Sequence, residues 1–332
     1  MATAWIRKLK ITLMSETSHK QIIFGDSAEY ARLTNAYAED PTIKVTGTKY
    51  LSPLKDEFVV YIKNVPMQAD DTIADVASVS EIKEGNYRYI TIESGYQDAS
   101  MVIFNGYIVF ISSKREEANK TISLILTCSG SYMYNNLNSL YFTVKKGTSY
   151  YSALTFAARR SGLSAKQVSI DSALKHRFLQ QDTTYDGTLT SILTELNTSD
   201  HKILCHNDLT SSGKFTIWDG SLVSKRTIHL TKENIILSNG FPTVNKEGIE
   251  FEILPFFNFI PGDEVILDDK TFIDEVITSL SSYEQMPSPH QYVDSEGKYI
   301  IKELSYNLEN RGDSFSLTLK CYSKANYSKF TS

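Results

Sequence analysis

The chain has 332 residues, 41% of them hydrophobic and 22% charged, a composition that excludes a largely disordered protein and allows two or three domains with substantial cores. Its 34 Lys and Arg against 39 Asp and Glu give a formal charge of -5, which argues against nonspecific DNA binding because such binding needs clustered cations. There is no signal-peptide pattern and no apolar run of about 18 residues, so we expect no membrane span.

Two residue types add to this outline. Tyr occurs 20 times and Phe 16 times, which favours half-buried sheets, because a strand can pack the ring of Tyr while its hydroxyl stays in water. Cys128, Cys205 and Cys321 are far apart and odd in number. They predict reduced thiols in a chain that folds in the cytoplasm, not a disulfide framework.

Residues 1–146 are predicted to form an N-terminal β domain, because apolar and polar residues alternate in most of its segments. The expected strands are Lys8–Leu13, Phe58–Ile62, Arg88–Ile92, Met101–Ile111 and Thr121–Cys128. The polar segment 113–120 fits a hairpin connection between the last two strands. Gly106, inside a strand pattern, indicates a bulge or a bend such as a small barrel uses at a corner.

Residues 147–225 are predicted to form a small α/β module. The first helix spans 150–161, with Thr148 or Ser149 as N-cap and Gly162 after its end. The second spans 188–199, where Leu189, Ile192, Leu193 and Leu196 share one face. Strands at 202–205 and 214–218 follow, and the turn pair Asp219-Gly220 closes the second.

Residues 226–332 are predicted to form a C-terminal β domain. Strands are expected at 248–254, 264–267, 298–306 and 314–321, with a turn at 261–263. The polar segment 281–298 carries Pro287, Pro289 and Gly297 and predicts an exposed loop. Glu309–Asp313 is predicted to be a hairpin turn.

The sequence holds no strong candidate for a catalytic, cofactor-binding or metal-binding motif. The phosphate-binding Gly patterns, Gly-x-Ser-x-Gly, His-Glu-x-x-His and Cys-x-x-Cys are all absent. His201, Cys205 and His206 are the best metal candidates, but neighbours on a strand point to opposite faces. A buried thiol beside an exposed imidazole is the better interpretation, and we expect no metal and no cofactor.

Four pairs of carboxylates and one cysteine are the candidate catalytic residues for a hydrolase. The pairs are Glu39-Asp40, Asp70-Asp71, Glu116-Glu117 and Asp268-Asp269. Each lies in a polar segment typical of solvated turns, and no opposing partner is fixed by the sequence. Cys128 ends an apolar alternating strand, which favours a core thiol over a nucleophile. The sequence therefore predicts no catalytic residue and a protein that is not an enzyme.

Aromatic residues offer two further interpretations. Phe256-Phe257-Asn258-Phe259 fits the core or a subunit interface better than a ligand platform. Trp218, Tyr292 and Tyr299 could stack on sugars in a receptor- or glycan-binding tail module. A tail-associated cell-wall hydrolase, acting through a carboxylate such as Glu117 or Asp269, is the other alternative.

An ordered set of short segments then resembles a known family. The segments are 91–96, 102–108, 123–128, 150–163, 186–193, 215–220, 240–242, 248–255, 260–266, 297–305 and 310–313. In this order they resemble the baseplate hub proteins of contractile-tailed phages, of the Mu-like kind. The chain departs from the family at Asn307, where His is frequent, and in the loop 281–298.

The resemblance implies a mainly β, α+β fold in which two tail-tube-like β-barrel domains flank the α/β module. It implies a structural subunit of the virion's tail baseplate, assembled in the host cytoplasm. Three copies would form a ring that joins the six-fold tail tube to a three-fold central spike. The other implied partners are further baseplate proteins and the tape measure protein, and DNA would pass through the channel without specific binding.

Overall fold

The computed structural model describes most of the chain in separate stretches. These are residues 7–15, 21–25, 41–51, 56–66, 87–96, 99–116, 121–130, 139–198, 203–208, 214–219, 226–231, 243–244, 248–267 and 297–323. The loop predicted at 281–298 lies almost wholly outside them, as do Gly220 and the segment 240–242.

Strands make up most of the described residues. They are β1 (Arg7–Ser15), β2 (Gln21–Phe24), β3 (Thr42–Tyr50), β4 (Glu57–Pro66), β5 (Tyr87–Tyr96), β6 (Ala99–Glu116), β7 (Thr121–Ser129), β8 (Leu140–Val144), β9 (Val168–Ile170), β10 (Thr183–Gly187), β11 (Ile203–Asp208), β12 (Lys214–Asp219), β13 (Thr227–Leu230), β14 (Thr243–Val244), β15 (Gly248–Ile253), β16 (Glu264–Leu267), β17 (Lys298–Glu309) and β18 (Phe315–Ser323). The helices are α4 (Tyr150–Arg160), α5 (Leu189–Thr198) and the 3-10 turn η1 (Ser172–His176).

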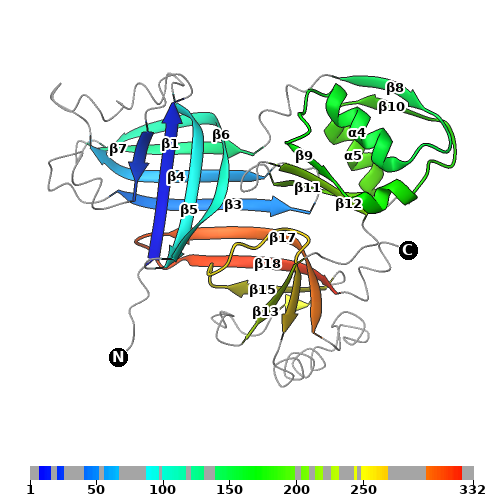
Figure 1. Cartoon of the computed structure of the whole chain (residues 1–332). Helices are drawn as coiled ribbons and strands as arrows, with labels where there is room; N and C mark the ends of the chain where they lie inside the picture. The colour runs from blue at the N-terminus through cyan, green and yellow to red at the C-terminus, as the bar shows by residue number, and fades with distance from the viewer. Residues whose placement is uncertain are drawn as a thin grey trace.

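The N-terminal and C-terminal strands belong to one sheet of 13 strands. Its main path runs β14-β15-β18-β17-β3-β4-β7-β6-β5-β1-β2, and β13 and β16 attach beside β17. The antiparallel pairing of β3 with β17, from Lys44–Glu309 to Tyr50–Glu303, joins the two halves. In Figure 1, β1 and β5 run across β3 and β4, while β15, β17 and β18 continue the sheet toward the C-terminus.

Strand β6 bends the sheet. Its first part pairs with β5 and its second with β7, and Tyr107 is opposite a residue of both, Tyr89 and Ser129. Gly106 stands immediately before this change of partner. A Cβ there would lie 2.4 Å from the ring of Phe104 and 2.9 Å from the carbonyl oxygen of Ser129. Gly106 thus lies where β6 changes partner, and the glycine is needed for close packing.

The curled sheet encloses a single core that draws on both halves. Fully buried side chains such as Leu13, Phe58, Leu304 and Leu319 belong to the same cluster. Tyr96 on β5 packs edge to face on Phe315 of β18, with ring centroids 5.2 Å apart. The two β halves are thus packed as well as hydrogen-bonded to each other.

The α/β module has a core of its own, running from Leu140 to Ile217. In Figure 1 its two helices lie between the ribbon β8-β10 and the sheet β11-β12-β9. Helix α4 begins at the N-cap Ser149, whose hydroxyl accepts a hydrogen bond from the amide of Ser152 at 3.3 Å. After the C-cap Ser161 comes Gly162 with φ of 100°, in the left-handed conformation that commonly ends a helix.

The predicted fold class, mainly β with a small α/β part, is confirmed. The predicted strands all occur, with ends shifted by a few residues, and the predicted helices begin and end within about two residues of α4 and α5. The domain limits 1–146, 147–225 and 226–332 stay a prediction, and the module's core already begins at Leu140. None of the described helices is long and apolar enough to cross a membrane.

Candidate interaction surfaces

The described residues hold no cluster that could bind a metal, since nowhere among them do three or more His, Cys, Asp or Glu side chains converge. Cys205 is fully buried in the module core, and burial raises the pKa of its thiol. His201 lies outside the described residues, and only the backbone of His206, on β11, is described. Cys205 therefore sits in the core as predicted, where burial disfavours the thiolate form that binds a metal.

Of the candidate hydrolytic residues, Cys128 is the one whose side chain lies within the described part of the chain. Cys128 is fully buried on β7, its Sγ lies 3.6 Å from the carbonyl oxygen of Leu126, and burial raises the pKa of the thiol. A neutral buried thiol is a poor nucleophile, because the thiolate is the reactive form. The pairs Glu39-Asp40, Asp70-Asp71 and Asp268-Asp269 lie outside the described residues, as does Glu117, and Glu116 is described only as the last backbone position of β6.

An open sheet edge is the most prominent surface feature of the β part. Beyond Tyr107, β6 pairs with β7 alone among the described strands, so residues 108–116 offer their second edge to a partner. The bulge between Ile108 and Phe110 turns apolar side chains outward here, with Val109 43% and Phe110 62% exposed. A long apolar edge strand pairs readily with another chain.

The sequence carried a signal for this edge that the strand prediction did not use. Ile108–Ile111 is four consecutive apolar residues, whereas a strand with one buried face alternates. All four side chains are half-buried or exposed, although the strand itself was predicted correctly. Ile108 and Ile111 pack against the main core, whereas Val109 and Phe110 between them face solvent.

The aromatic loop 256–259 divides between core and surface. Phe259 is fully buried, and the rings of Phe256 and Phe257 meet it edge to face with centroids 5.8 and 5.4 Å away. Phe256 and Phe257 are themselves 36% and 39% exposed. The guanidinium of Arg226 lies 5.1 Å above the Phe257 ring. The loop is therefore anchored by one ring and presents two others to solvent.

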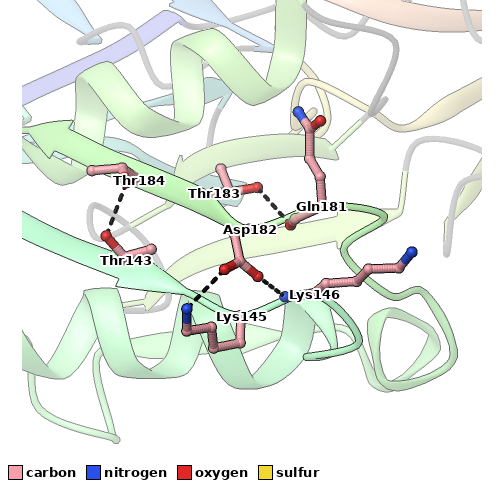
Figure 2. Close-up of polar contacts among 7 residues, drawn as sticks. All are labelled: Thr143, Lys145, Lys146, Gln181, Asp182, Thr183 and Thr184. Atoms are coloured by element: carbon pink, nitrogen blue, oxygen red, sulfur yellow. Dashed lines mark hydrogen bonds and ion pairs between the residues drawn. The ribbon is translucent and has the colours of Figure 1, made fainter.

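A second exposed surface is the ribbon β8-β10. Asp182 accepts hydrogen bonds at 2.8 Å from the Nζ of Lys145 and from the amide of Lys146 (Figure 2). The hydroxyls of Thr143 and Thr184 lie 2.9 Å apart on the outer face. The ion pair is exposed, so it fixes the end of the ribbon and adds little to stability.

The candidate sugar-stacking residues do not form a common platform. Tyr299 is fully buried in the main core, so its proposed stacking role is wrong. Trp218 is half-buried, and its ring is in contact with the turn at Gly262, where a Cβ would lie 3.1 Å from the indole. This contact joins the module to the C-terminal strands. Tyr292 lies outside the described residues.

No protein-family profile matches the chain, and no curated protein matches it in sequence. Solved structures do share its fold. The 43 kDa tail protein of prophage MuSo2 from Shewanella oneidensis superposes with a TM-score of 0.54 at 11% identity, over 96% of this chain and 97% of its own. A tail protein from Neisseria meningitidis MC58 gives 0.54 at 10% identity, over 98% and 99%.

A third structure, the E. coli c3393 protein, is a component of the type VI secretion system described as structurally similar to the T4 bacteriophage tail proteins gp27 and gp5. It superposes with a TM-score of 0.51 at 8% identity, over 88% of this chain and 76% of its own. At these identities the comparisons establish the fold alone. The chain has the fold of phage tail proteins, which confirms the resemblance seen in the sequence as a likeness of architecture.

Proposed function

We propose that the chain is a structural subunit of a phage tail baseplate hub, with no catalytic activity. The observation that carries this proposal is the extent of the shared fold, because two tail proteins match this chain over at least 96% of its length and at least 97% of theirs. A likeness of that extent covers both β halves and the module together. A domain reused in an unrelated protein matches over only part of a chain.

In this proposal three copies form a ring around a channel, and each contributes its two β halves. Three subunits with two β halves each would present six β halves to a six-fold tail tube, while the ring keeps three-fold symmetry toward a central spike. The pairing of β3 with β17 supports this arrangement, because it holds the two halves in a fixed relation.

The open edge of β6 is the proposed contact between neighbouring subunits. A ring needs two different surfaces that fit each other, and an edge strand supplies one of them through backbone hydrogen bonds. Residues 108–116 would pair with an edge of the next copy, and Val109 and Phe110 would leave water. Removing apolar side chains from water stabilises such a contact by about 25 cal/mol per Å2.

The proposed partners follow from the hub role. They are the central spike, the tail tube, further baseplate proteins and the tape measure protein, all in the virion tail. DNA would pass through the channel without specific binding, and the formal charge of -5 is compatible with a lumen that does not hold phosphates.

The mass of the purified protein in solution tests the ring. We expect light scattering over a concentration series to approach three times 37.5 kDa, directly or on addition of the spike protein. Phe110→Asp should return the mass to that of one chain, because a carboxylate is costly to bury in the subunit contact. Phe178→Asp, at a 48% exposed position on the module, is the matched control and should assemble like the parent.

A parent protein that stays monomeric at every concentration, with and without spike protein, would overturn the ring. Equal loss of assembly in both variants would show that the contact is not at β6. The absence of catalysis is tested separately, by incubating the protein with several purified cell walls. Release of soluble fragments would contradict the structural role.

A further inference from the structure

The module carries a small hollow between α4 and β9. It has a volume of about 120 Å3, and its lining combines aliphatic and polar side chains. The lining residues are Tyr151, Thr155, Ala158, Arg159, Leu163, Ser164, Ala165, Val168 and Ile170. A cavity of about 150 Å3 accepts benzene, so this hollow fits a single aliphatic side chain.

The surroundings of the hollow are strongly basic, in contrast to the rest of the chain. Residues 145–177 contain seven Lys and Arg and one Asp, whereas the remaining residues contain 27 Lys and Arg and 38 Asp and Glu. Arg159 lines the hollow, and the Nζ of Lys175 lies 4.9 Å from the ring centroid of Tyr151, another lining residue. Lys166 lies in the sequence between the lining residues Ala165 and Val168. All three side chains are exposed.

The cations around the hollow have no ion-pair partner in the part of the chain that the structure describes. Among the residues that the structure describes, Arg159, Lys166 and Lys175 form no ion pair, whereas Arg177 nearby is paired with Asp219 at 2.9 Å. Like charges held close together repel one another and are relieved by an anionic partner. The face is therefore complementary to an acidic occupant.

Strand β9 gives this face backbone groups as well. Among the described strands it pairs only with β12, in parallel. The carbonyl of Gln167 and the amide of Asp171 both bond to β12, at 2.7 and 2.8 Å. Backbone groups alternate in direction along a strand, so those of Val168 and Ile170 point away from β12, toward the open edge. Strand addition at such an edge is a common mode of peptide recognition.

We propose that this face binds an acidic, extended peptide segment of a partner protein. The segment would add to the edge of β9, place one aliphatic side chain in the hollow, and set carboxylates against Arg159, Lys166 and Lys175. A small hollow beside a strand edge favours a peptide over a nucleic acid, whose bases stack on exposed aromatic rings. The site is independent of whether the chain forms a ring.

Selection from a random peptide display library on the whole protein tests the proposal. We expect enriched peptides to combine several Asp or Glu with a central Leu, Ile or Val. A labelled synthetic peptide of the enriched sequence should bind about tenfold or more weakly to Arg159→Glu/Lys175→Glu, measured by fluorescence anisotropy. Ala165→Trp, which fills the hollow without changing charge, should weaken binding similarly.

Lys146→Glu is the control, because it reverses the charge of one exposed residue before the other end of α4. It should bind the peptide like the parent. Circular dichroism melts establish that every variant is folded. The proposal is overturned if the selection enriches no peptide or enriches peptides without acidic residues. It is also overturned if Lys146→Glu and the double variant bind the peptide equally, whether both keep binding or both lose it. Binding of labelled oligothymidylate in place of the peptide would point to a nucleic acid and overturn it as well.

Discussion

The rings of Phe58 and Tyr306 meet across a strand that separates them, with centroids 5.5 Å apart. Phe58 is on β4 and Tyr306 on β17, and Gly47 of β3 is directly opposite both. Strands two apart in a sheet are about 9.6 Å from each other, so side chains of this size touch only where the residue between them is small. Gly47 therefore allows the N-terminal and C-terminal halves to share one aromatic contact.

Gly47→Ala should destabilise the protein by about 1–3 kcal/mol, because a Cβ would lie 2.2 Å from the Phe58 ring and force it to move. Urea unfolding measures the change. Gly147→Asn is the control, since Gly147 has φ of 84°, which Asn tolerates, and a Cβ there meets nothing within 4 Å. An unchanged midpoint for Gly47→Ala would show that the Phe58 ring moves aside without cost.

Asp263→Ala should cost about 2–3 kcal/mol, because this buried carboxylate fixes the Pro-Gly-Asp turn. Its Oδ1 accepts a hydrogen bond from the Nε of Arg226 at 3.0 Å, and its Oδ2 accepts one from the amide of Ile260 at 2.8 Å. Asp182→Ala removes a carboxylate from an exposed pair and serves as control, with no measurable change in the urea midpoint expected. Equal effects of the two substitutions would contradict the role given to Arg226 and Asp263.

Tyr185→Phe should make the protein less sensitive to alkali. Burial, with smaller contributions from Tyr150 and Glu195, raises the pKa of Tyr185 to about 12. A phenol whose pKa is raised on folding contributes stability that is complete below about pH 10 and is lost as the pH rises through 12. Since the side chain is buried and its pKa is raised by roughly two units, we expect the parent to lose about 2 kcal/mol more than Tyr185→Phe over this range.

Thermal melts of both proteins between pH 9 and pH 12 measure this difference. Below that range Tyr185→Phe should be as stable as the parent, because the Tyr185 hydroxyl is buried without a hydrogen-bond partner among the described residues. Parallel curves for the two proteins would show that Tyr185 ionises as readily in the folded protein as in the unfolded chain.

The three buried cysteines test the predicted division of the chain. Cys128 and Cys321 belong to the main core and Cys205 to the module core, and burial raises the pKa of all three thiols. In variants that keep one cysteine each, we expect a thiol reagent to label Cys205 at a lower urea concentration than the other two. Cys128 and Cys321 should become reactive together, because one sheet holds both.

Labelling of Cys205 together with both other thiols would instead show that the module and the main sheet unfold as one unit. A gap between Cys128 and Cys321 would indicate that the pairing of β3 with β17 opens first. Native protein without urea should react slowly at every position, since the thiolate is disfavoured and the side chains are enclosed.

The positions of individual strands and helices could be predicted from the sequence, because they depend on residues close together in the chain. Apolar alternation located β1, β5, β7 and β18, and an N-cap with a terminal glycine located α4. The order of short segments also predicted the fold that the chain shares with phage tail proteins. Strand β3, whose Thr42–Tyr50 is broken by Gly47 and rich in Thr and Lys, was missed because its alternation is weak.

The surfaces that carry the proposals were decided by tertiary structure alone. The pairing of Tyr306 with Gly47 spans most of the chain, and nothing near either residue specifies the other. The open edge of β6 exists because β5 ends its pairing at Tyr107, and the basic hollow exists because β9 and η1 bring Lys166 and Lys175 beside α4. Sequence sets the period and charge of each segment, but which segments meet depends on burying all the apolar faces at once.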